Sequence, residues 1–171
     1  DILDGLTEEE RSEGLSLFVQ VTAIPQGAEG EDDAELGLKR VPVSDASTPN
    51  SNPVIDHVLF EGVEVTEGTV VEVEADQPYE IEPILTDDSV ETYEYVAIDG
   101  TIEDRVEEPY FTVYVEQGSL NAVNTLYPAS AFDWTSPSAP EPAETKVWII
   151  VQDRRGGMNW WTLDIVVRER A

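Results

Sequence analysis

The stretch that most constrains the fold is residues 146–170, KVWIIVQDRRGGMNWWTLDIVVRER. It holds two runs in which apolar residues recur at every second position, which is the side-chain period of a β-strand. The segment DRRGG at 153–157 separates the runs and is typical of a tight turn. We therefore predict two long strands joined by this turn. Their expected core positions are Val147, Ile149 and Val151 on the first strand and Trp161, Leu163, Ile165 and Val167 on the second.

Shorter segments of the same character occupy much of the remaining chain. In residues 69–75, Val71, Val73 and Ala75 alternate with glutamates, so one face is expected to be buried and the other wet. Residues 119–144 are less regular and end in the run 136–144, whose three prolines favour an extended crossover. Many short strands with turn signals and almost no helix predict an all-β protein, an antiparallel β-sandwich of immunoglobulin-like type. The other expected strands lie at 15–24, 36–45, 54–60, 79–85, 91–98, 101–108 and 110–118.

Composition divides the chain into two parts. Residues 46–53 have no apolar side chain larger than alanine and include two prolines, which favours a linker. We predict an N-terminal β segment over residues 1–45 and the β-sandwich over residues 54–171.

Within the N-terminal part, the two strand segments 15–24 and 36–45 are expected to pair as a hairpin. Pro42 lacks a backbone N–H donor, so the second strand should lie at a sheet edge. A short helix is expected at 7–13, where Thr7 precedes three glutamates that the helix dipole favours in a first turn. An isolated hairpin is only marginally stable in water, so this one should need further strands or a partner.

Three segments in fixed order carry a family resemblance. They are YFTVYVEQGSL at 110–120, the Trp-Thr-x-Pro segment at 134–137, and VWIIVQDRRGGMNW at 147–160. The order resembles the C-terminal half of PKD and immunoglobulin-like modules, in which the pattern VWVxVxDxRGGxxW closes the sandwich. Such modules occur in bacterial surface proteins and lipoproteins, including many from myxobacteria. The resemblance covers about residues 53–171 and implies an Ig/PKD-like fold with no catalytic residues.

The charge of the chain excludes some partners. There are 37 acidic and 9 basic residues, which give a formal net charge of −28 at pH 7. Nucleic acids and anionic lipid surfaces would be repelled, so we expect no nucleic-acid partner. Three interpretations of the acidity stay open: a solvated surface that resists aggregation, adaptation to a saline habitat, and binding of a divalent cation.

Calcium is the cation that clustered carboxylates favour, because it takes several oxygen ligands. Candidate ligands stand in the cluster at 31–33 and in two later groups. None of the three groups has the spacing of an EF-hand loop. As loop charges in water these residues need no ligand. The later candidates are Asp87, Asp88, Asp99, Glu103 and Asp104.

Residues for catalysis or a tightly bound cofactor are scarce. The chain has no cysteine and a single histidine, His57, so thiolate chemistry, ordinary zinc sites and a Ser-His-Asp triad are not supported. His57 is expected to be a half-buried strand residue. The DRRGG segment at 153–157 is no phosphate loop, and turn geometry with positive φ accounts for its glycines. We therefore predict that the protein is not an enzyme.

The expected location is outside the cytoplasm of a bacterium, on the cell surface or secreted. No apolar run approaches the roughly 20 residues of a membrane-spanning helix. No signal peptide is present, and the start at Asp1 suggests a processed N-terminus, so a lipid anchor upstream stays open.

Two features of the stretch 146–170 predict that its surface contacts another part of the chain or another protein. Trp148, Ile150 and Trp160 fall on the strand faces opposite the core, and a large apolar outer face usually marks contact with another domain or subunit. The hairpin of residues 15–43, a neighbouring subunit, the rest of a larger protein and a stacked sugar all stay open as what covers this face. Arg154 and Arg155 form the main basic patch and are expected to face acidic segments between residues 61 and 108, in the same chain or in a neighbour.

We accordingly expect a structural surface protein that displays, spaces or assembles through sheet edges and faces. The alternatives are a subunit of an extracellular filament or surface layer, and a carbohydrate- or calcium-dependent binding module.

Overall fold

The computed structural model describes residues 2–7, 10–11, 14–24, 34–45, 49–97, 99–138 and 143–170. The chain divides into two units, Asp1–Asn50 and Ser51–Ala171. The division falls inside the segment 46–53 that composition marks as a linker. Within the described ranges no helix is long and apolar enough to cross a membrane.

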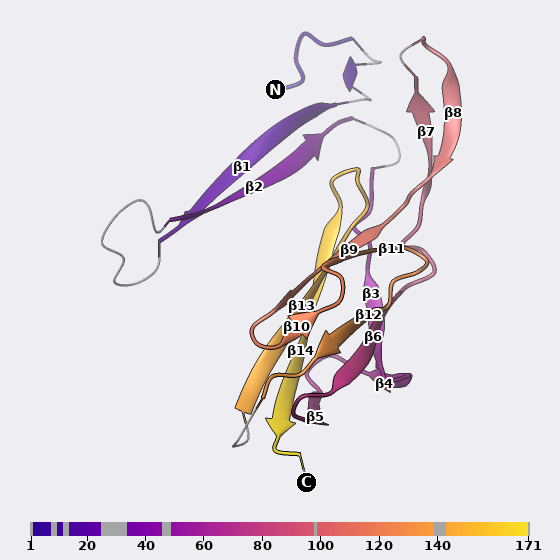
Figure 1. The fold of residues 1–171 in the computed structure, drawn as a ribbon. Coiled ribbons are helices and arrows are strands. Elements are labelled where there is room, and N and C mark those ends of the chain that lie inside the picture. Colours follow the sequence, from indigo (N-terminus) through magenta and orange to yellow (C-terminus); the bar gives the residue numbers. More distant parts are fainter. Residues whose placement is uncertain are drawn as a thin grey trace. The chain divides into compact units, whose positions relative to one another are not determined.

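The first unit contains one antiparallel hairpin, as predicted. Strands β1 (Leu15–Ala23) and β2 (Glu35–Val43) pair along their whole length, from Leu15 opposite Val43 to Ala23 opposite Glu35 (Figure 1). The acidic cluster at 31–33 lies outside the described residues.

The helix expected at 7–13 is described only in part, because residues 8–9 and 12–13 lie outside the described ranges. Glu10 and Arg11 have helical geometry. The Thr7 and Glu10 side chains form a reciprocal cap, in which the Glu10 N–H donates to Thr7 Oγ1 (3.2 Å) and the Thr7 N–H donates to Glu10 Oε2 (2.8 Å). The hydrogen bonds from Thr7, backbone first, lower the pKa of Glu10.

The second unit is built on two five-stranded sheets. Sheet I has the order β10-β12-β6-β3-β4, and sheet II has the order β11-β9-β13-β14-β5. The strands of sheet I are β3 (Ile55–Phe60), β4 (Val63–Val65), β6 (Pro78–Leu85), β10 (Ser119–Leu120) and β12 (Phe132–Thr135). The strands of sheet II are β5 (Val70–Glu74), β9 (Tyr110–Val115), β11 (Asn124–Leu126), β13 (Ala143–Gln152) and β14 (Met158–Arg168).

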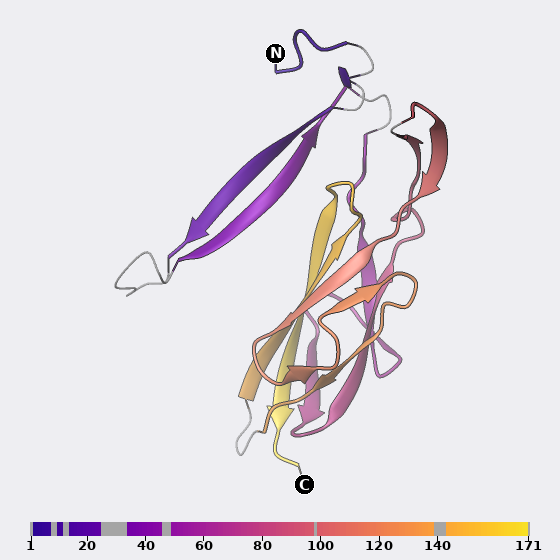
Figure 2. The same ribbon diagram turned by 45° about the horizontal axis from the view of Figure 1, so that its top comes forward.

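A third sheet of this unit is the hairpin of β7 (Thr92–Val96) and β8 (Ile102–Val106). Figures 1 and 2 show it extending from the end of the unit at which the turn between β13 and β14 lies. All described β8 side chains are exposed.

One hydrophobic core joins the inner faces of sheets I and II. The seven core positions predicted on β13 and β14 are buried, so the two long strands and their inward faces are confirmed. On β5, Val73 is buried as predicted, whereas Val71 is only partly buried. Removal of these apolar side chains from water is the main favourable term in folding the unit. The least exposed core side chains are Val58, Ile81, Phe132 and Trp134 from sheet I, and Phe111, Val113, Val147, Ile149, Val151, Leu163, Ile165 and Val167 from sheet II.

The structure corrects the sequence prediction in two places. Residues 119–144 contain strands β10, β11 and β12, and β12 pairs with β6 in the interior of sheet I, where Trp134 is fully buried. Strand β5 pairs with β14 in parallel, whereas the sequence predicted antiparallel pairing throughout. The all-β class and the N-terminal hairpin are confirmed.

Candidate functional site

The outer face of sheet II carries a group of large apolar side chains, here called the aromatic face: Tyr110, Tyr114, Trp148, Ile150 and Trp160. Trp148 lies opposite Tyr114, and Ile150 lies opposite Trp160, across neighbouring strands. Trp160 is 63% exposed and Tyr114 is 56% exposed. The outward orientation predicted for Trp148, Ile150 and Trp160 is confirmed.

Two tyrosines complete this face. Alternation in the expected strand 110–118 puts Tyr110 and Tyr114 on the face opposite Phe111, but it does not say which side chains of other strands lie beside them. Their neighbourhood depends on the pairing of β9 with β13, which no local pattern reveals. Beside them the Thr112 hydroxyl donates to Asn124 Oδ1 over 2.9 Å, so the rim of the aromatic face is polar.

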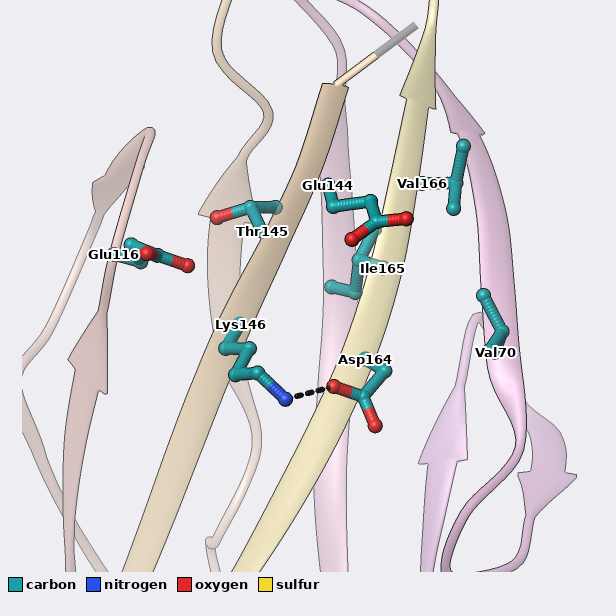
Figure 3. A pocket seen from close by; sticks show the side chains of 8 residues that line it. All are labelled: Val70, Glu116, Glu144, Thr145, Lys146, Asp164, Ile165 and Val166. Atoms are coloured by element: carbon teal, nitrogen blue, oxygen red, sulfur yellow. Dashed lines mark hydrogen bonds and ion pairs between the residues drawn. The ribbon is translucent and has the colours of Figure 1, made fainter.

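Charged residues border the aromatic face along the strands. Two residue pairs beyond Trp148 and Thr162, on the same face, Lys146 on β13 forms an ion pair with Asp164 on β14 (Figure 3). Asp164 raises the pKa of Lys146, through its hydrogen bond first and its charge second. The carboxylates of Glu116 and Glu144 lie at the same hollow of about 400 Å³, whose other lining residues are Val70, Thr145, Ile165 and Val166 (Figure 3). Carboxylates outnumber cations there, so the hollow favours positively charged groups.

The turn between β13 and β14 is held from inside by Asp153. This side chain is buried, and its Oδ1 accepts the backbone N–H groups of Arg155 (2.7 Å), Gly156 (2.9 Å) and Gly157 (2.9 Å). Positive φ occurs at Arg154 (67°) and Gly156 (118°). Positive φ therefore explains Gly156, whereas Gly157 is required because a Cβ there would overlap the Asp153 carboxylate. The expectation that both glycines serve positive φ is wrong for Gly157.

Arg155 connects this turn to the base of the β7–β8 hairpin. Its Nη1 donates to Glu107 Oε1 over 2.7 Å and to Glu91 Oε2 over 3.3 Å. The Glu107 side chain is 1% exposed, and its Oε2 accepts the Glu91 N–H over 3.1 Å. The Arg155 guanidinium also lies 4.2 Å from the centroid of the Tyr93 ring. This cluster fixes the orientation of the hairpin relative to the turn.

Arg154 also forms an ion pair with a glutamate, and this pair is exposed to solvent. Its Nη1 lies 3.4 Å from Glu108 Oε2, and both side chains are more than half exposed. The basic patch thus meets carboxylates between residues 61 and 108 within one chain, which is the intramolecular form of the expected pairing.

The candidate calcium ligands are not gathered in one place. Asp88 accepts the Thr86 hydroxyl, and Asp99 accepts the hydroxyl and backbone N–H of Thr101, which lower its pKa in that order. Glu103 pairs with Arg105.

Asp104 lies opposite Glu94 in the β7–β8 ladder, and Asp87 is an exposed turn residue. No three carboxylate or histidine side chains of the described residues are arranged to hold a metal ion. His57 lies on β3 with its Nδ1 2.9 Å from Asp56 Oδ2 and its side chain 22% exposed.

The geometry thus defines an all-β protein with several antiparallel sheets and an exposed aromatic face. No known family model matches the chain, and no curated protein does. Among solved structures, a nucleoside hydrolase-related hypothetical protein from Saccharophagus degradans, associated with carbohydrate metabolism, is similar with a TM-score of 0.39 and 9% identity. The alignment covers 67% of this chain, which spans 26% of that one.

A candidate bacterial DNA-binding protein from Bacteroides vulgatus is similar with a TM-score of 0.31 and 13% identity, over 99% of this chain and 79% of the other. Both similarities are distant and assign no family.

Proposed function

We propose that the protein is a non-enzymatic structural module of a bacterial cell surface, built as an Ig/PKD-like sandwich. In such sandwiches strands A, B, E and D form one sheet and strands C, F and G the other. Lettered in chain order, β3, β6, β12 and β10 occupy the places of A, B, E and D, and β9, β13 and β14 those of C, F and G. The β7–β8 hairpin is then an insertion between B and C. This order supports the Ig-like assignment beside the sequence resemblance of residues 147–160.

The module acts by associating with protein through its sheet surfaces. The observation that carries this proposal is the aromatic face, where Trp160 is 63% and Tyr114 is 56% exposed on the outer face of sheet II. Clustered exposed aromatic side chains are enriched at protein interfaces, because they bury much area at little conformational cost. Copies of the same chain are the proposed partners, which makes the protein a subunit of a surface assembly or filament.

Replacing Trp160 with glutamate is expected to weaken self-association at least tenfold, since it places an unpaired charge in the buried centre of the contact. Light scattering coupled to size-exclusion chromatography over a wide concentration range measures the effect. Val63, which is 67% exposed on β4 of sheet I, supplies the matched control: Val63→Glu should leave association unchanged. A wild-type chain that stays monomeric at every concentration contradicts the proposal.

A carbohydrate-binding function is the second candidate, and the aromatic face favours it as well. Exposed Tyr and Trp rings on one sheet face with polar neighbours such as Thr112 and Asn124 suit stacking against sugar rings. On this alternative, a glycan array detects binding that Trp160→Ala reduces at least tenfold and Val63→Ala does not change. Absence of any bound glycan removes this candidate and leaves protein association in place.

A further inference from the structure

Carboxylates outnumber cations at one border of the aromatic face. Beyond Trp148, the next row of side chains on the same face holds Glu116, Lys146 and Asp164. Glu144 follows one row further, at the same hollow (Figure 3). Lys146 pairs with Asp164, whereas the exposed side chains of Glu116 and Glu144 form no hydrogen bond or ion pair with a described residue. This border is therefore negatively charged.

The opposite border, at the turn between β13 and β14, is negative as well. The Arg154 guanidinium lies 5.8 Å from the ring centroid of Tyr110, a member of the aromatic face. Together with Arg155 it meets three carboxylates, so these arginines are already paired within their own chain. The carboxylates are those of Glu91, Glu107 and Glu108. Two negative borders thus enclose an uncharged centre.

A second copy of the chain brings further negative charge to these borders. Each copy has a formal net charge of −28 and only 9 basic residues. At least six of these bases form ion pairs inside their own chain, namely Arg11, Arg105, Lys146, Arg154, Arg155 and Arg168. Few bases remain to offset carboxylates across a contact between copies, so copies repel one another in water of low ionic strength.

We propose that salt switches on self-association through the aromatic face. Without salt, repulsion between the acidic copies outweighs the apolar contact. Screening removes the repulsion and leaves the apolar contact, because burial of apolar surface does not depend on charge. The inference rests on the proposed self-association and names what regulates it. An interface held by ion pairs between copies would respond to salt in the opposite sense.

The distances involved indicate the salt range. The screening length is about 30 Å in 0.01 M salt, about 8 Å in 0.15 M and about 3 Å in 1 M. Two residues along a strand span about 7 Å, which is the spacing between the Trp148 row and the Glu116 row. Carboxylates at the border therefore act on the contact at low and at physiological ionic strength, and they cease to do so near 1 M.

Light scattering coupled to size-exclusion chromatography tests this on the full chain. Raising sodium chloride from about 0.01 M to about 1 M is expected to lower the dissociation constant of self-association about a hundredfold. Association that weakens with salt, or that stays the same, overturns the inference and leaves the proposed self-association in place. A wild-type chain that stays monomeric at every salt concentration overturns both.

A pair of matched variants separates charge at the border from the charge of the whole chain. Glu116→Gln with Glu144→Gln should associate about tenfold more tightly than the wild type at low salt and about equally at 1 M. Glu64→Gln with Glu80→Gln removes as much charge from the outer face of sheet I, and its effect at low salt should be less than about threefold. Equal effects of the two double variants would mean that the borders have no special role, against the inference.

Trp160→Ala shows whether salt acts through the aromatic face. In 1 M sodium chloride this variant should associate at least about tenfold more weakly than the wild type, because the main exposed ring of the contact is lost. If the variant and the wild type associate equally at 1 M, salt drives copies together at another surface and the inference is wrong.

Discussion

Replacing Asp153 with alanine is expected to lower the free energy of unfolding of residues 51–171 by about 3 kcal/mol. The buried carboxylate accepts three consecutive backbone N–H groups within the turn that joins the two longest strands. Alanine leaves these donors without their acceptor, and the N–H of Gly157 is itself buried.

Asp153→Asn provides the control for this prediction. Asparagine keeps an oxygen in the place of Oδ1 but removes the negative charge, and hydrogen bonds to a charged acceptor are about twice as strong as neutral ones. We expect it to cost about 1 kcal/mol. Urea unfolding followed by tryptophan fluorescence measures the second unit alone, because all four tryptophans lie at positions 134, 148, 160 and 161. Equal stability of the alanine variant and the wild type would mean that the turn is held by the strands.

Local alternation carried most of the strand prediction. In β13 and β14 every second residue is apolar over a long run, and the burial follows that alternation without exception from Val147 to Val151. Strand β12 has only four residues, Phe132–Thr135, in a segment rich in proline and serine. It is a strand because Phe132 and Trp134 pair with β6 and fill the core, and such tertiary pairing outweighs local preference.

Only those residues of the candidate site that lie on the outer face of a strand could be predicted from the sequence. The outward side of Trp148 and Trp160 can be read from alternation with buried neighbours. The partners of Arg155 cannot, since Glu91 and Glu107 lie 64 and 48 residues away in the chain. With 37 acidic residues available, no spacing rule selects these two. The pairing depends on the β7–β8 hairpin, which brings its two ends together.

The two arginines of the turn form a natural comparison between a buried and an exposed ion pair. Arg155 meets the buried Glu107, whereas Arg154 meets the exposed Glu108 one residue further along. Exposed pairs contribute little because water and salt screen them, so Glu108→Gln should change stability by less than about 0.5 kcal/mol. A buried carboxylate that loses its counter-charge is far more costly.

Replacing Arg155 with methionine is therefore expected to lower the free energy of unfolding by about 3 kcal/mol, because it strands the Glu107 carboxylate in the interior. Methionine still covers the Tyr93 ring, so the loss reports mainly on the charge. Glu107→Gln alone should cost about 1–2 kcal/mol, since Arg155 is 24% exposed and keeps Glu91.

The double variant decides between a charge effect and simple loss of contacts. Glutamine at position 107 can still accept the N–H of Glu91 but carries no charge to strand. In the Arg155→Met variant, Glu107→Gln should thus raise the free energy of unfolding by about 2 kcal/mol. In the wild type, the same substitution should lower the free energy of unfolding. Urea titrations of the wild type, the two single variants and the double variant complete this double-mutant cycle. If the two losses instead add, Glu107 is not held in the interior by the charge of Arg155, and the cluster joins the turn to the hairpin through packing alone.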